Sequence, residues 1–177
     1  WYQRSLYRVS SRFENISTLL ILSTATRIHL FYYLANSLKR AQESLVHSYL
    51  EKGRWKSDVL MHFLTDQSAV PQLILSDEEE NLLCVYTKVL RNQTHCYLTR
   101  FDSKNAFWSK PAPLFQKQGK CGGFRGFTDS EGILHMVWRE VTGEKSILSY
   151  KSIDTEALNF SGTDVLIWEG PGPLPYP

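Results

Sequence analysis

The sequence has no segment long and apolar enough to span a bilayer, because its longest aliphatic run, "LLIL" at 19–22, is soon followed by Arg27. Its net charge is also small. The formal value of +2 at pH 7 is too close to neutral to indicate a nucleic acid or an anionic membrane as partner. No secretory leader is apparent, and the chain begins at Trp1 rather than Met. We therefore expect a processed, truncated or partial chain without a membrane span.

Cysteine is scarce, and Cys84, Cys96 and Cys121 form neither a CxxC pair nor a metal-ligand spacing. An odd number of cysteines allows at most one internal disulfide, and we favour buried thiols in strands. The glycine-rich phosphate loops, dinucleotide fingerprints and serine elbows of common enzymes are also absent. No metal, cofactor or catalytic residue is predicted from the sequence.

What is present is a globular composition. Hydrophobic residues make up 42% of the 177 residues and aromatic residues 13%, enough for one domain with a real core. Asn15, Asn92 and Asn159 stand in N-x-S/T sequons. These sequons matter only in a secreted eukaryotic chain, and they favour an extracellular or cell-surface location.

The segment "ILHMVWREVTGEKSILSYKSID" at 133–154 reads as two strands joined by a turn at 142–144. Two strands alone cannot bury their apolar faces. The sequence "LHMVW" at 134–138 aligns with "IHLFY" at 28–32 and "LLCVY" at 82–86. Each copy follows a short strand and a polar turn, and each precedes a third strand, so the hairpin is the middle of a repeated unit.

An aromatic residue marks the next part of each unit. Trp55, Trp108 and Phe160 recur at intervals of 53 and 52 residues. Four short strands in about fifty residues is typical of a β-propeller blade. A blade packs both faces against neighbours, which fits strands that are apolar at nearly every position.

We therefore predict an all-β fold, a β-propeller of four-stranded antiparallel blades, with about three blades that form half of a six-bladed ring. The predicted parts are an outer strand of a preceding blade at 1–13, three blades at 14–66, 67–120 and 121–170, and a Pro/Gly-rich tail or linker at 171–177. Three blades cannot close a ring. Closure would require further blades in a longer chain or self-association of copies.

One alternative concerns the first unit. The segment "SLKRAQESLVHSYLEKGRW" at 37–55 has helical propensity and could form a helix. In that case the first blade is irregular, and the repeat depends on the second and third units.

The units resemble the repeats of sialidase-like (Asp-box-type) β-propellers, since "EGILHMVWREVTGEKSILSYKS" matches their strand and aromatic pattern over about residues 14–168. The Asp-box turn of that family, S-x-D-x-G-x-T-W, is degenerate. Phe101, Ser103 and Asn105 precede Trp108 where Ser, Asp and Gly would stand. The resemblance implies the fold, and we do not carry over the catalytic residues.

Arg125 is the sharpest departure from the repeat. When "GFRGF" is aligned with "PQLIL" and "TLLIL", Arg125 falls at the position of Leu73 and Leu19. In a propeller this first strand is the innermost and lines the central channel. An arginine there is either a ligand-binding group or a buried ion-pair partner, and both interpretations stay open.

Three equivalent aromatics, Tyr32, Tyr86 and Trp138, are candidate sugar-stacking residues. The alternative, which we favour, places them in the core between blades. The acidic run "DEEE" at 77–80 lacks calcium-ligand spacing and is interpreted as a solvated turn, with Asp129 as the equivalent turn former.

His29 and His135 stand at the position of Leu83, which indicates a packing position rather than a metal site.

Fold alone does not define function. The repeat without a catalytic set favours a non-enzymatic recognition or scaffold module that binds a glycan or protein at the channel mouth. Two alternatives stay open: a fragment of a sialidase-like glycoside hydrolase, and a self-assembling structural subunit.

Overall fold

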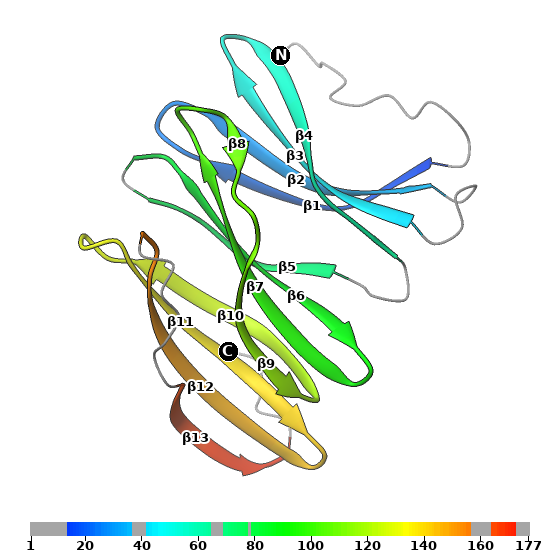
Figure 1. The fold of residues 1–177 in the computed structure, drawn as a ribbon, viewed down its shortest axis with the longest axis vertical. Helices are drawn as coiled ribbons and strands as arrows, with labels where there is room; N and C mark the ends of the chain where they lie inside the picture. Colours follow the sequence, from blue (N-terminus) through cyan, green and yellow to red (C-terminus); the bar gives the residue numbers. More distant parts are fainter. Residues whose placement is uncertain (1–13, 37–41, 65–68, 78, 157–163, 173–177) are drawn as a thin grey trace. The chain divides into compact units, whose positions relative to one another are not determined.

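The computed structural model shows an all-β chain that divides into two compact units, Trp1–Ser68 and Ala69–Pro177 (Figure 1). The residues that it describes are 14–36, 42–64, 69–77, 79–156 and 164–172. All regular structure in these ranges is β-strand, so nothing there is a helix of the length and apolarity that a membrane crossing requires. The predicted outer strand at 1–13, the anchor Phe160 and most of the tail (173–177) lie outside the described residues.

The first unit holds one antiparallel sheet in the order β1-β2-β3-β4. Its strands are β1 (Glu14–Ser23), β2 (Ile28–Asn36), β3 (Gln42–Glu51) and β4 (Arg54–Leu64). The helical alternative is therefore wrong for residues 42–55. Leu45, Val46 and Tyr49 are buried in β3, and this burial with pairing on both sides outweighs local helical propensity.

The first sheet of the second unit has five strands. They are β5 (Ala69–Ser76), β6 (Leu82–Leu90), β7 (Gln93–Asp102), β8 (Phe107–Trp108) and β9 (Ala112–Gln118). Both β8 and β9 pair with β7, so together they form one interrupted outer strand. Pro111 lies in the interruption, where its missing N–H cannot donate to a ladder.

The second sheet of this unit runs in the order β10-β11-β12-β13. Its strands are β10 (Lys120–Thr128), β11 (Ile133–Thr142), β12 (Lys145–Asp154) and β13 (Val165–Pro171). The predicted hairpin at 133–154 is confirmed. Gly143 takes a positive φ of 60° in its turn, a conformation that glycine adopts without steric cost.

The two sheets of the second unit share one hydrophobic core. Its buried members are Leu83, Val85, Cys96, Leu98, Leu114, Phe124, Leu134, Met136, Trp138 and Ile153. Leu73, Leu75, Phe115 and Cys121 pack against its border. One face of the β5–β9 sheet thus packs on one face of the β10–β13 sheet. In β10–β13, the residues that alternate with these core residues along each strand point to the opposite face.

The strand pairing corrects the predicted position of Arg125 in the repeat. Arg125 pairs with Val137, and Leu73 pairs with Val85, the equivalent residue of β6. The corresponding residue of β1 is Leu20, which pairs with Phe31. Leu20 and not Leu19 is therefore the first-unit equivalent of Arg125.

Candidate functional site

Aspartates shape two neighbouring turns of the second unit. In the β5–β6 turn, Asp77 accepts hydrogen bonds from the backbone N–H and the side chain of Asn81, at 2.8 and 3.0 Å. In the β10–β11 turn, Asp129 Oδ1 accepts from the N–H groups of Glu131 and Ile133, at 3.0 and 2.9 Å. The prediction that Asp77 and Asp129 are equivalent turn formers is confirmed.

A third aspartate caps the β7–β8 turn. Asp102 Oδ1 accepts from the N–H groups of Lys104 and Asn105, and Oδ2 accepts from the Asn105 side chain. These hydrogen bonds, with that from the Asn105 N–H the largest cause, lower the pKa of Asp102. The alignment with the Asp-box pattern puts Ser103 at the aspartate position of this turn, but the carboxylate stands one residue earlier.

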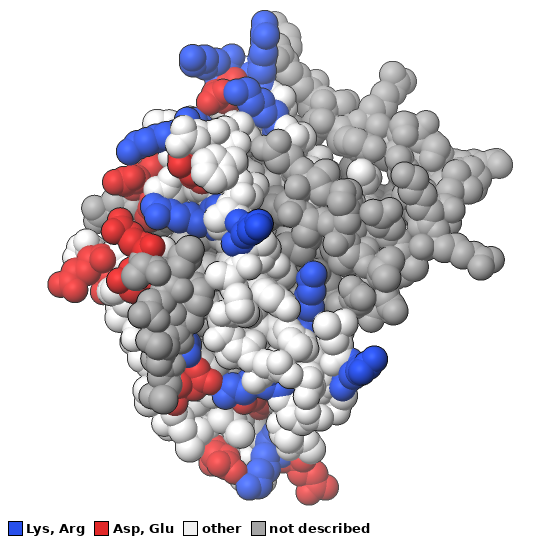
Figure 2. Space-filling model, viewed as in Figure 1, with Lys and Arg blue, Asp and Glu red and all other residues white. Residues whose placement is uncertain are grey.

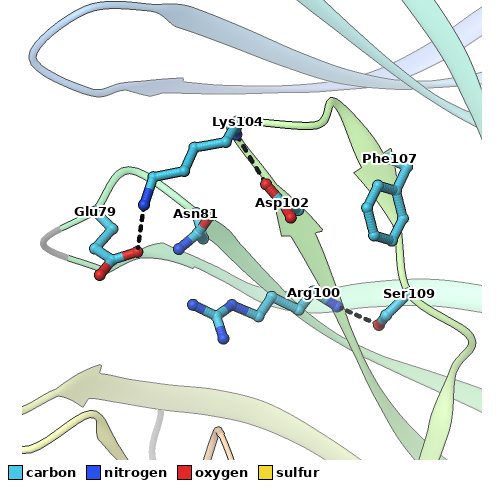
Figure 3. A pocket seen from close by; sticks show the side chains of 7 residues that line it. All are labelled: Glu79, Asn81, Arg100, Asp102, Lys104, Phe107 and Ser109. Atoms are coloured by element: carbon cyan, nitrogen blue, oxygen red, sulfur yellow. Dashed lines mark hydrogen bonds and ion pairs between the residues drawn. The ribbon is translucent and has the colours of Figure 1, made fainter.

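These turns line two adjoining pockets that share Glu79 and Arg100, and we call the pair the turn groove. One pocket, of about 270 Å³, is lined by Glu79, Asn81, Arg100, Asp102, Lys104, Phe107 and Ser109 (Figure 3). The other, of about 200 Å³, is lined by Asp77, Glu79, Arg100, Asp129, Ser130, Glu131, Gly132, Thr155 and Glu156.

Ion pairs hold the cations of the turn groove. Arg100 Nη2 lies 3.1 Å from Asp77 Oδ2, and Lys104 Nζ lies 3.5 Å from Glu79 Oε2. Figure 3 shows that the Arg100 guanidinium extends into the pocket beneath Asn81, with Phe107 at the other end. The Phe107 side chain is 54% exposed, so an apolar ring lies next to hydrogen-bonding groups from several turns.

The turn groove is acidic overall. Six carboxylates line it against two cations, which leaves a formal excess of four negative charges. Figure 2 shows Asp and Glu side chains gathered along the left edge of the view, where Figure 1 places the β5–β6 and β10–β11 turns. Such a groove disfavours an anionic ligand and accommodates neutral hydroxyl groups or cations.

Arg125 lies apart from the turn groove, on the outer face of β10. It is exposed, and its Nη1 donates to the carbonyl oxygen of Phe124 at 2.9 Å. The interpretation of Arg125 as a buried ion-pair partner is therefore wrong. The other interpretation, a ligand-binding group, stays a prediction.

The three candidate stacking aromatics are buried in the described structure. The exposed fractions of Tyr32, Tyr86 and Trp138 are 4%, 2% and 0%. Tyr32 pairs by hydrogen bond with Ser48, and Tyr86 stacks on Tyr97 with ring centroids 5.3 Å apart. This burial fits the core alternative, and no ring face of the three is open to a sugar.

The two equivalent histidines have polar partners that the packing interpretation missed. His29 Nδ1 lies 2.9 Å from His47 Nε2 in the buried interior of the first sheet. His135 bonds both Asp129 and Tyr150. The available sequence signal was that histidine occupies this repeat position in two of the three units, while the other unit has Leu83. Among the described residues, no group of three or more His, Cys, Asp or Glu side chains is placed to hold a metal.

The fold has a counterpart among solved structures. An endo-arabinase from Bacteroides thetaiotaomicron VPI-5482 matches with a TM-score of 0.58 at 13% identity, over 91% of this chain and 64% of that one. A thermostable family-43 glycoside hydrolase matches with a TM-score of 0.43 at 11% identity, over 88% of this chain and 75% of that one. The chain thus spans less than two thirds of the endo-arabinase.

The likeness to the endo-arabinase shows the fold alone, an all-β, propeller-like arrangement of antiparallel sheets. No protein-family model matches the sequence, and no curated protein matches it. The propeller-like class is supported, whereas the sialidase-like repeat and the number of blades stay predictions.

Proposed function

We propose that the chain is part of a β-propeller that binds a neutral carbohydrate in the turn groove. Its three sheets act as three blades of a ring that further sheets or a second copy complete. The observation that carries this proposal is the exposed Phe107 ring beside Asn81, Arg100 and Asp102. Sugars present apolar faces that stack on aromatic rings, and hydroxyl groups that bond to carboxylates, amides and guanidinium groups.

The charge of the turn groove supports a neutral rather than an acidic sugar. A sialoside or uronate would bring a carboxylate toward the excess negative charge. The cations Arg100 and Lys104 are ion-paired with Asp77 and Glu79, so an acidic sugar would have to compete for them.

Two of the six groove carboxylates, Asp102 and Asp129, are unsuited to act as the general acid of a glycosidase. A glycosidase needs one carboxylic acid with a raised pKa to protonate the leaving group. Hydrogen bonds lower the pKa of Asp102, and hydrogen bonds from His135 and two turn N–H groups lower that of Asp129. Both side chains are thus held as carboxylates that shape their turns.

The test is titration calorimetry with neutral oligosaccharides, arabinan fragments included. We expect saturable binding that weakens about two- to tenfold in Phe107→Ala, because loss of a stacking ring costs about 0.5–1.5 kcal/mol. Phe127→Ala is the matched control, since Phe127 is 60% exposed against 54% for Phe107 and lies outside the groove. Equal affinity of Phe107→Ala and wild type would overturn the groove as the binding site.

A hydrolase fragment is the second candidate, because one solved structure of similar fold is that of an endo-arabinase. The same oligosaccharides, incubated with the chain and analysed for new reducing ends, separate the two functions. Release of new reducing ends would show that the chain hydrolyses these oligosaccharides, and it would contradict the proposal of binding without hydrolysis.

A further inference from the structure

The two pockets of the turn groove differ in charge. In the pocket lined by Phe107, which we call the Phe107 pocket, two carboxylates balance two cations. The other, which we call the Asp129 pocket, has five carboxylates against the single cation Arg100, so it holds the whole negative excess of the groove. Its described lining residues include no aromatic ring. The two pockets therefore suit different parts of a ligand.

Neither pocket alone reaches the usual size of a small-molecule site. The Phe107 pocket measures about 270 Å³ and the Asp129 pocket about 200 Å³, below the usual range of about 300–1,000 Å³. Because they adjoin at Glu79 and Arg100, the two pockets together fall within that range. A ligand that fills the groove is thus longer than the group that either pocket holds.

Two equivalent aspartates hold the turns around the Asp129 pocket. Oδ1 of each accepts from the backbone N–H of the fourth residue after it, at 2.8 Å for Asp77 and 2.9 Å for Asp129. Oδ2 lies against a side chain of the sheet, Arg100 at 3.1 Å from Asp77 and His135 at 2.9 Å from Asp129. Each aspartate accepts three hydrogen bonds in all, so the two side chains build the wall of the pocket.

Thr155 joins the end of β12 to the β10–β11 turn. It is 6% exposed, and its Oγ1 donates to the carbonyl oxygen of Gly132 at 2.8 Å. The Thr155 N–H bonds to the same oxygen, at 3.4 Å. This side of the Asp129 pocket is thus also fixed by hydrogen bonds within the protein.

Glu131 and Glu156 supply the acceptors of the Asp129 pocket. Both are exposed, and within the described part of the chain neither side chain has a hydrogen-bond or ion-pair partner. An ionised carboxylate only accepts hydrogen bonds. The part of a ligand that enters this pocket must therefore offer donors, and the hydroxyl groups of a sugar are donors without charge.

Arg100 stands where the two pockets adjoin. Its ion pair with Asp77 uses Nη2, and its guanidinium extends into the Phe107 pocket (Figure 3). A guanidinium has five N–H groups. Arg100 thus has further donors for oxygens near the link between two sugar units.

We propose that the turn groove binds a chain of at least two neutral sugar units. One unit stacks on Phe107, and the next lies in the Asp129 pocket with its hydroxyl groups on Glu131 and Glu156. This inference rests on the proposed function, because it specifies the length and the hydroxyl pattern of the carbohydrate bound there.

The test is titration calorimetry with arabinose, arabinobiose and arabinotriose, the arabinan fragments of one, two and three units. We expect arabinobiose to bind about tenfold more tightly than arabinose, because its second unit adds hydrogen bonds to charged acceptors. The affinity for arabinotriose should lie within about threefold of that for arabinobiose, since the groove consists of two pockets.

Variants locate the second unit. Glu131→Ala and Glu156→Ala should each weaken arabinobiose binding about tenfold and leave arabinose binding unchanged. Phe107→Ala should weaken the binding of both sugars. Glu144→Ala is the control, because it removes an exposed glutamate of the β11–β12 turn outside the groove.

The outcomes separate this inference from the proposed function. Equal affinity for arabinose and arabinobiose, with both weakened by Phe107→Ala, would overturn the inference and leave the groove as a site for one sugar unit. Unchanged arabinobiose binding in both Glu131→Ala and Glu156→Ala would do the same. Binding that Phe107→Ala leaves unchanged, or no saturable binding of the three sugars, would overturn the proposed function and the inference with it.

Discussion

Trp138 Nε1 donates a hydrogen bond to Glu140 Oε1 at 3.0 Å, and both residues are buried two positions apart on β11. The same carboxylate oxygen accepts from Ser149 Oγ at 2.8 Å and lies 3.2 Å from Lys117 Nζ. Lys117 also pairs with Asp164, at 2.7 Å. A buried acid beside the largest fully buried side chain thus has three partners on one carboxylate oxygen, as burial of charge requires.

We expect Glu140→Ala to lower the free energy of unfolding by about 3–5 kcal/mol, the range found when one partner of a buried ion pair is removed. Trp138 and Lys117 would lose their shared acceptor. Urea unfolding measures the change, and Glu144→Ala, an exposed glutamate in the next turn, is the control. Equal stability of the two variants would show that the Glu140 network contributes little.

Gly126→Ala is expected to destabilise the second unit by about 1–3 kcal/mol, as overpacking does. A Cβ at Gly126 would stand 2.5 Å from the His135 carbonyl oxygen and 3.0 Å from Leu73 Cδ2. Gly122→Ala on the same strand is the matched control, since a Cβ there meets nothing within 4 Å. Thermal melting of the two variants should separate them, and a melting temperature of Gly126→Ala as high as that of Gly122→Ala would contradict the close approach.

The stability of the first unit should depend on pH through His47. Burial, followed by the charges of His29 and Arg27, lowers the pKa of His47 from 6.5 to about 3. The unfolded chain therefore binds the proton more tightly than the folded chain between these values. Stability is complete above pH 6.5 and falls by up to about 1.4 kcal/mol for each pH unit below it.

Urea unfolding at pH 7 and pH 5 measures this effect for the wild type and for His47→Gln. The wild type should lose about 2 kcal/mol more than the variant between the two pH values. The same loss in both proteins would assign the pH dependence to other groups.

The cysteines should react slowly in the folded protein. All three are free thiols, and burial raises the pKa of Cys84 and of Cys121 to about 12. The thiolate is the reactive form, so little of it exists at pH 8. An aromatic disulfide reagent should label three thiols within minutes in guanidinium, and the native chain far more slowly. Rapid labelling of native Cys84 would contradict its burial.

Much of the fold could be predicted because it depends on local patterns. The segments "LHMVW" and "KSILSYKSI" have the apolar spacing and turn signals of paired strands, and β11 and β12 follow them. The segment 42–55 was ambiguous, because its residues accept helical backbone as well as extended backbone. Pairing with β2 and β4 decided it, and that pairing depends on residues distant in the sequence.

The candidate sites were less predictable, because each forms where turns or strands meet. Arg125 stood out in the sequence only as a break in a leucine pattern. Its neighbours His135 and Tyr150 come from two other strands, and strand register alone brings them to one pocket. The sequence analysis missed Asp102 because the motif alignment placed the aspartate position at Ser103, one residue later. Only the hydrogen bonds from the turn N–H groups to Asp102 identify it as the residue that caps the turn.

The all-β class and the strands that pair as neighbours follow from the amino-acid order, because alternation, turn residues and repeat spacing act over short distances. Which side chains are buried in the core and which are exposed at a candidate site was decided only by the packing of whole sheets. Tyr86 and Trp138 are buried, whereas Phe107 and Phe127 are exposed. Burial depends on what covers a face, and that cover comes from other parts of the chain.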